Sequence, residues 1–173
     1  MKLRLPLVLI SAVCLASSLP AQDPAKPKAP GAQQTSAHGV SFEYPGELRQ
    51  TATTDTTGSQ YQLKPAAGQP SLLVQIYSTD ITPEKALELN LRKNRELKNS
   101  RNSRFSERAV QETIAGQPCA GKEFRYLVKG VPVQQRFFTL AVNNRTVLVM
   151  TLGRLSDDDV TRKHFAPVLA SLH

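Results

Sequence analysis

The chain has 173 residues, of which 40% are hydrophobic and 21% are charged, and its 22 Lys and Arg residues outnumber its 14 Asp and Glu residues to give a net charge of +8. This length suits a single domain, and the composition excludes wholesale disorder. Two cysteines exclude a disulfide-stabilised scaffold, and no apolar run reaches the roughly 20 residues of a membrane-spanning helix.

Residues 1–21 have the layout of a secretory signal peptide. Basic residues near the start precede a mostly apolar stretch, 5–19, which ends in small residues. Ser18 and Ala21 are both acceptable as the last residue of the leader. A buried N-terminal helix or an uncleaved anchor would share the apolar stretch, but a run of this length interrupted by Pro6 is short for a membrane span. We therefore predict export to the periplasm or the extracellular space.

The two cysteines, Cys14 and Cys119, are separated by this leader. A lipid-modified Cys14 would need a small residue before it, and Val13 stands there. If cleavage removes Cys14, Cys119 is left without a partner for an internal disulfide. No motif around Cys119 activates a thiol, so we expect it to be a small buried apolar residue.

Residues 22–38 contain three prolines, two lysines and several Ala and Gln residues. Such a stretch buries too little apolar surface to offset its ordering entropy, so it is predicted to be a flexible tether. Residues 39–173 are then expected to form the single folded domain.

Alternation of apolar and polar residues predicts a strand over 40–44, ended by Pro45 and Gly46. A second strand is expected near 59–63. Residues 71–78 are more continuously apolar, which is typical of a central strand buried on both faces.

A helix is predicted over 81–100. Thr82 is a suitable N-cap, and Pro83 suits the first helical position. Leu87 and Leu91 share one face with asparagines, so packing is expected to weaken beyond the first turns.

The remaining elements are strands and a C-terminal helix. The strands are expected over 108–114, 120–128, 131–142 and 145–152. Asn143 and Asn144 suit a type I′ hairpin turn between the last two. Ser156 is expected to cap the closing helix, and Pro167 to kink or restart it. The predicted apolar side of that helix comprises Val160, Phe165, Val168, Leu169 and Leu172.

These elements predict an α+β fold: an antiparallel sheet of about six strands with helices packed on it. Four segments carry a resemblance to a known family: 39–45 (GVSFEYP), 81–87 (ITPEKAL), 113–120 (TIAGQPCA) and 165–172 (FAPVLASL). In their order and spacing they resemble the PsbP/Mog1-like domains, including exported bacterial proteins of the DcrB and DUF1795 type. One departure is the absence of Trp, where Leu48 stands near the position that a Trp often takes.

The resemblance covers about residues 39–173 and implies an α/β/α sandwich. Members of the family include a photosystem II subunit and a nuclear-transport factor that binds a small GTPase. They resemble binding or accessory modules and share no catalytic residues. The resemblance therefore implies a fold more than an activity.

Motifs for catalysis and metal binding are absent from the sequence. It contains no zinc-ligand spacing, phosphate-binding loop, dinucleotide fingerprint or nucleophile elbow. We therefore expect no catalytic residues, no metal and no cofactor. A weak metal patch of His164 with residues 157–159 is an alternative, although three aspartates in a first helical turn are explained by the helix dipole.

Basic residues are concentrated between positions 92 and 108, where only Glu96 and Glu107 are acidic. They are Arg92, Lys93, Arg95, Lys98, Arg101, Arg104 and Arg108. Such a patch attracts an anionic partner, such as a phosphate-rich polymer, a lipid headgroup or a nucleic acid. A solvated helix end explains the same residues. Phe105 is the one aromatic residue among them, so sequence-specific nucleic-acid binding is not expected.

The leading hypothesis is an exported, non-enzymatic binding or accessory domain of the cell envelope, with a protein or another envelope component as its partner. The alternative is a binder of an anionic ligand through residues 92–108. An enzyme or metal protein would require a deep pocket that holds His164 or several carboxylates.

Overall fold

The computed structural model describes residues 31–99 and 105–173, with only the backbone described for 97–99. Its elements are β1 (Ala32–Ala37), β2 (Val40–Pro45), β3 (Arg49–Asp55), β4 (Gly58–Lys64), β5 (Ser71–Tyr77), α1 (Pro83–Asn99), β6 (Ser106–Ile114), β7 (Gln117–Val128), β8 (Val131–Val142), β9 (Arg145–Arg154), the 3-10 turn η1 (Leu155–Asp157) and α2 (Asp158–Ala170). None of these helices is both long enough and apolar enough to cross a membrane.

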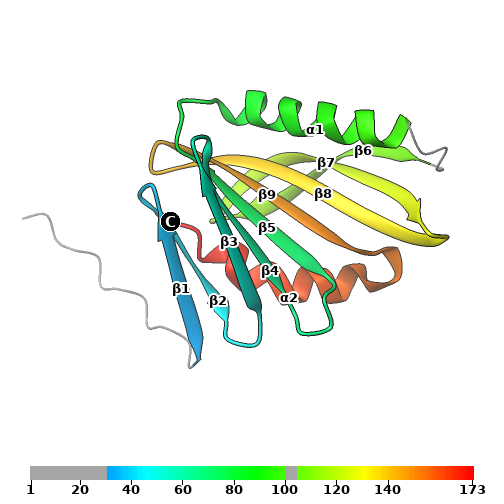
Figure 1. Cartoon of the computed structure of the whole chain (residues 1–173), viewed down its shortest axis with the longest axis horizontal. Coiled ribbons are helices and arrows are strands. Elements are labelled where there is room, and N and C mark those ends of the chain that lie inside the picture. Colours follow the sequence, from blue (N-terminus) through cyan, green and yellow to red (C-terminus); the bar gives the residue numbers. More distant parts are fainter. Residues whose placement is uncertain (1–30, 100–104) are drawn as a thin grey trace, which may run out of the picture.

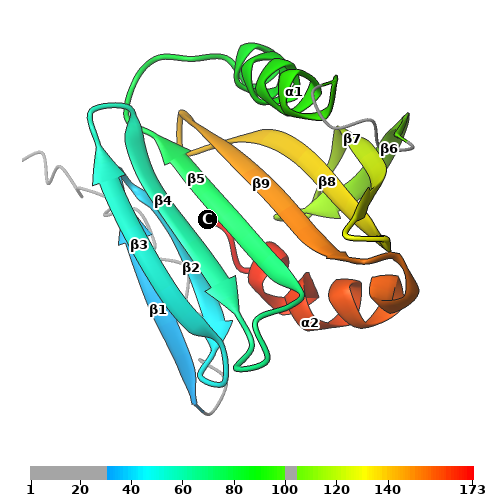
Figure 2. The same cartoon turned by 45° about the vertical axis from the view of Figure 1, so that its right-hand side comes forward.

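The molecule has three layers around a seven-stranded sheet. The strand order is β3-β4-β5-β9-β8-β7-β6, and every neighbouring pair is antiparallel. Helix α1 crosses one face of this sheet, while α2 and the β1–β2 hairpin lie on the other face (Figures 1 and 2). The α+β class predicted from the sequence is confirmed.

Strand β5 shows why the centre of the sheet is apolar on both sides. Leu72, Val74 and Ile76 face α2 and the β1–β2 hairpin, and Tyr77 contributes to the core beneath α1. Strand β5 lies between β4 and β9. Because successive side chains of a strand point to opposite faces, a strand covered on both faces must be apolar at nearly every position. The predicted central strand is confirmed.

Two cores result, one on each face of the sheet. The larger is built around Phe42, Phe138 and Phe165, which join β2, β8 and α2. The smaller lies beneath α1 and contains Phe124 and Phe137.

Helix α1 begins and packs as its sequence suggests, with one difference. Thr82 accepts a hydrogen bond from the backbone N–H of Lys85 at 3.3 Å, as an N-cap does. Packing does not weaken at Asn90, because its side-chain amide donates to the Tyr77 hydroxyl at 3.0 Å and to the Ala86 carbonyl at 2.8 Å. This asparagine therefore attaches the helix to β5.

The expected number of strands is wrong in two respects. The main sheet has seven strands, because the polar edge strand β3 pairs with β4. Strand β1 lies inside the segment predicted to be a flexible tether, yet all six of its residues pair with β2. Backbone pairing to a neighbour fixes a polar strand that has no apolar face of its own. The folded part therefore includes residues 32–37, while the predicted leader and residues 22–30 of the predicted tether lie outside the described residues.

The C-terminal helix also departs from expectation. Helix α2 starts at Asp158 after η1, and the Ser156 hydroxyl donates to Asp157 at 2.7 Å and does not cap the helix. The helix continues through Pro167 to Ala170. Val160 is 59% exposed and does not belong to the apolar side, whereas Phe165, Val168 and Leu172 are buried as predicted.

Candidate binding site

The face of the sheet beneath α2 carries a row of charged residues across three strands. In the strand register, Arg108 of β6 lies opposite Glu123 of β7, and Glu123 lies opposite Arg136 of β8. Residues paired in this way point to the same face and lie close enough for their side chains to meet.

Glu123 is at the centre of this row, with a side chain that is completely buried. Its carboxylate accepts hydrogen bonds from Arg108 at 2.6 and 3.0 Å, from Arg125 at 2.8 Å and from Arg136 at 2.9 Å. Burial alone raises the pKa of Glu123, but the hydrogen bonds from Arg108 and Arg136 and the charges of Arg136 and Arg125 outweigh burial and lower the pKa to about 2. The carboxylate is therefore ionised at any physiological pH.

Arg136 extends the row to α2. Its side chain is 5% exposed, and the guanidinium pairs with Asp158 in the first turn of the helix through contacts of 2.9 Å to both carboxylate oxygens. The Gln134 side chain donates to the same carboxylate at 2.7 Å. Asp158 thus fixes the start of α2 on β8, which goes beyond the helix-dipole role expected for residues 157–159.

All the charges in this row are matched by partners, so the row is structural. The carboxylate of Glu123 has three arginine partners, and Arg136 has a carboxylate on either side. A general acid or base needs a proton that it can exchange near neutral pH, and these ion pairs do not provide one. We call Arg108, Glu123, Arg136 and Asp158 the ion-pair row.

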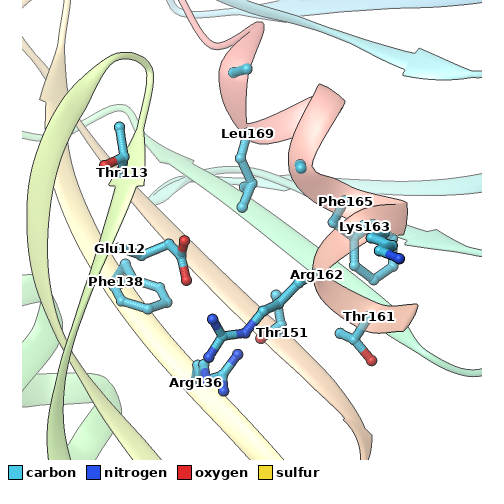
Figure 3. A pocket seen from close by; sticks show the side chains of 12 residues that line it. Glu112, Thr113, Arg136, Phe138, Thr151, Thr161, Arg162, Lys163, Phe165 and Leu169 are labelled. Carbon is cyan, nitrogen blue, oxygen red and sulfur yellow. The ribbon is translucent and has the colours of Figure 1, made fainter. Parts of the chain in front are cut away.

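Beside the ion-pair row, a pocket of about 380 Å³ opens between α2 and the sheet. Phe138, Phe165 and Leu169 form apolar parts of its lining, and Glu112 of β6 and Arg162 of α2 are charged residues of that lining (Figure 3). The volume lies at the lower end of the range for small-molecule sites. Glu112 is the one carboxylate among the lining residues, and His164 is not one of them.

A second candidate surface is the end of the β7–β8 hairpin. Leu127, Val128 and Val131 are exposed by 39%, 45% and 41%, and the hairpin turns at Lys129 and Gly130. A hollow of about 250 Å³ lies alongside it and is lined by Phe105, Tyr126, Leu127 and Pro132 among others. We call Phe105, Leu127, Val128, Val131 and Pro132 the tip surface.

Of the seven basic residues between 92 and 108, the structure describes the side chains of four, and two of these four are bound to buried or half-buried carboxylates. Arg95 donates to Glu107 at 2.9 Å, and Arg108 belongs to the ion-pair row. Arg92 is exposed and lies 3.9 Å from Glu96, while Lys93 is exposed. Arg101, Arg104 and the side chain of Lys98 lie outside the described residues.

Cys119 and His164 are the remaining residues considered from the sequence, and the buried Nε2 of His164 has no hydrogen-bond partner among the described residues. Cys119 is 4% exposed, and burial raises the pKa of its thiol, as expected for a structural cysteine. Among the residues with described side chains, no three His, Cys, Asp or Glu groups are arranged to hold a metal ion. The ring of His164 packs edge-on against Phe165 with 5.4 Å between centroids.

The sequence contained only a partial signal for these sites. The ion-pair row requires the register of three strands, and the pocket requires the position of α2. Alternation along β7 places Lys122 and Phe124 on one face, so it assigns Glu123 to the face that proves to be buried. An acidic residue on a buried face indicates a charged partner on a neighbouring strand.

No family model matches the chain, and no curated protein matches it. Among solved structures, cyanobacterial PsbP (CyanoP) from Synechocystis sp. PCC 6803 superimposes with a TM-score of 0.55, covering 89% of this chain and 98% of the other at 16% identity. The fold is PsbP-like. At this identity the match establishes the fold alone, and the DcrB and DUF1795 families are not confirmed.

Two further structures are similar at lower identity. A protein from Bacteroides thetaiotaomicron VPI-5482 has a TM-score of 0.50 and 12% identity, covering 78% of this chain but 44% of the other. The chain thus spans less than half the length of that protein. The Ran-binding protein Mog1p of Saccharomyces cerevisiae matches with a TM-score of 0.49 and 11% identity over 82% of this chain and 94% of its own.

Proposed function

We propose that this PsbP-like chain is an exported, non-enzymatic binding domain of the cell envelope that holds a protein partner on the tip surface. The observation that carries the proposal is the exposure of Leu127, Val128 and Val131 together on one hairpin end. Exposed apolar area costs about 25 cal/mol per Å² relative to burial, and apolar groups gathered in one patch mark interaction sites.

The hollow beside the hairpin supports a protein partner over a lipid surface. Its lining combines Phe105, Tyr126 and Pro132, and its volume of about 250 Å³ suits an inserted apolar side chain. Arg125 also lines this hollow, and its side chain is 40% exposed while it pairs with Glu123. Aromatic residues and arginine around a small hollow are typical of the energetically important centre of a protein interface.

The absence of catalytic motifs from the sequence and the matched charges of the ion-pair row support a non-enzymatic role. Export is supported by the leader-like residues 1–21, and the resemblance of the sequence to DcrB and DUF1795-type proteins agrees with it.

N-terminal sequencing of the protein isolated from its own cells should find a chain that begins after Ser18 or Ala21. A chain retaining Met1 would contradict export.

The docking of a partner is tested by placing the photo-reactive residue benzoylphenylalanine at Val131 of the full chain in its own cells. A discrete cross-linked adduct is expected, and Leu127→Asp in the same chain should reduce its yield about tenfold, since placing a carboxylate at an apolar interface costs at least about 1.4 kcal/mol.

Val160 provides the matched control, because it is 59% exposed but lies on α2. A chain with the probe at Val160 alone should give no such adduct. Val160→Asp combined with the probe at Val131 should leave the yield of the adduct from position 131 unchanged. Equal adducts from both probes, or a yield insensitive to Leu127→Asp, would show that the tip surface is not the docking site.

A further inference from the structure

The pocket between α2 and β6 is held open by attachments at both ends of the helix. At the start of α2, Asp158 pairs with Arg136 of β8. Near its end, the Leu169 carbonyl accepts a hydrogen bond of 2.9 Å from the backbone N–H of Ala115, in the turn after β6. Between these attachments the helix is fixed relative to the sheet, so the pocket is preformed and does not depend on a ligand to open it.

Close packing on either side of the pocket sets its walls. A Cβ atom on Gly153 of β9 would lie 2.8 Å from the Thr161 hydroxyl oxygen, so α2 sits directly against that strand. A Cβ atom on Gly121 would overlap the Phe138 ring, which therefore lies against the backbone of β7 and forms an apolar wall. The space left over lies toward β6.

Four charged side chains belong to the lining: Arg136 is paired within the ion-pair row, whereas Glu112, Arg162 and Lys163 have no saturating partner among the described residues. Glu112 forms no ion pair and no side-chain hydrogen bond within the described part of the chain. Arg162 lies 3.4 Å from Asp158 through its Nε and is 52% exposed, which leaves its terminal nitrogens available. In Figure 3 the carboxylate of Glu112 and the guanidinium of Arg162 extend from opposite walls toward the same space.

We propose that this pocket binds a zwitterion with an apolar body: a primary ammonium and a carboxylate on a free amino acid or a short peptide with apolar side chains. The ammonium pairs with Glu112, the carboxylate pairs with Arg162, and the apolar side chain contacts Phe138, Phe165 and Leu169. A purely anionic amphiphile such as a fatty acid could pair with Arg162 or Lys163, but it would leave the Glu112 carboxylate of the same lining without a cationic partner. The site is independent of the tip surface.

Binding is tested by calorimetric titration of the whole chain with L-phenylalanine and with the dipeptide Leu-Leu. The comparison distinguishes a free amino acid from a short peptide as the ligand. N-acetyl-phenylalanine lacks the ammonium and phenylalanine amide lacks the carboxylate. Each is expected to bind at least about tenfold more weakly than the parent zwitterion, the factor that corresponds to about 1.4 kcal/mol. Decanoate serves as the anionic amphiphile.

Variants of the two charged residues give a pattern that unfolding cannot imitate. Glu112→Gln should weaken phenylalanine while leaving N-acetyl-phenylalanine unchanged or tighter, and Arg162→Gln should weaken phenylalanine while sparing phenylalanine amide. Glu47→Gln is the control, because Glu47 is exposed away from this pocket. Leu127→Asp should not alter either titration, which separates this site from the partner-docking proposal.

Two outcomes would overturn the proposal. One is the failure of both zwitterions to bind with a Kd below about 1 mM. The other is decanoate binding more tightly than either zwitterion and becoming tighter still in Glu112→Gln, which would identify the pocket as a site for anionic amphiphiles.

Discussion

Replacing Glu123 with glutamine is expected to lower the free energy of unfolding by about 3–5 kcal/mol, the cost of breaking a buried ion pair from one side. The side chain of Glu123 is completely buried, and that of Arg136 is 5% exposed. Without the carboxylate, Arg136 keeps its charge in a dry environment and retains Asp158 as its one carboxylate partner. Urea denaturation of the variant and the wild type at neutral pH measures the difference.

Two milder substitutions keep this prediction testable if Glu123→Gln does not fold. Arg125→Gln removes a 40% exposed partner of the same carboxylate and should cost less than about 1 kcal/mol. Glu47→Gln removes an exposed carboxylate and should change stability little. A loss from Glu123→Gln no larger than that from Glu47→Gln would show that the ion-pair row does not support the fold.

The ion-pair row also sets a pH dependence. The pKa of Glu123 is about 2 in the folded chain against an ordinary value of 4.5, so the folded state binds this proton less readily than the unfolded state. The stabilising contribution is therefore complete above pH 4.5 and is lost as the pH falls toward 2. Glu107, whose pKa is lowered by its hydrogen bond with Arg95, adds to the same trend. Stability measured from pH 6 to pH 2 should decline less steeply in Glu123→Gln than in the wild type.

The elements that could be predicted from the sequence are those with a strong local signal. Strand β5 carries a continuous apolar run, α1 has a capping threonine, and Asn143 and Asn144 have the positive φ values, 48° and 61°, that the predicted turn requires. Strands β1 and β3 carry no such signal, because their residues are mostly polar and at least partly exposed. They are strands because β2 and β4 supply the backbone partners, and that information is tertiary.

The difference between local and tertiary signals also explains how much of the candidate sites could be predicted from the sequence. Counting charges along 92–108 did not reveal that Arg108 is paired, because its partner Glu123 lies 15 residues further along the chain. The charged pair at the pocket, Glu112 and Arg162, comes from β6 and α2, and no spacing rule connects them. The tip surface had a partial signal, since apolar residues flank the Lys129–Gly130 turn on both sides, where polar residues are usual.

Phe42→Ala is expected to cost about 3–5 kcal/mol of folding free energy, the range for truncating a fully buried phenylalanine. Phe42 is 0% exposed, and its ring meets that of Tyr61 edge-on with 5.6 Å between centroids. Its strand, β2, belongs to a two-stranded sheet, and such a hairpin is not stable by itself in water. Packing of Phe42 against β4 therefore holds the hairpin on the main sheet.

The loss of stability in Phe42→Ala should also affect the residues that follow α2. The backbones of Ser41 and His173 exchange two hydrogen bonds, at 2.7 and 3.0 Å, so the residues after α2 depend on the position of β2. Hydrogen exchange in Phe42→Ala should show the amides of Ser41 and His173 losing protection together with those of β1. Phe105→Ala, which truncates a phenylalanine that is 38% exposed, should cost less and leave those amides protected. If Phe42→Ala cost no more than Phe105→Ala, the hairpin would be an independent appendage, and the cooperative unit would begin at β3, after Leu48.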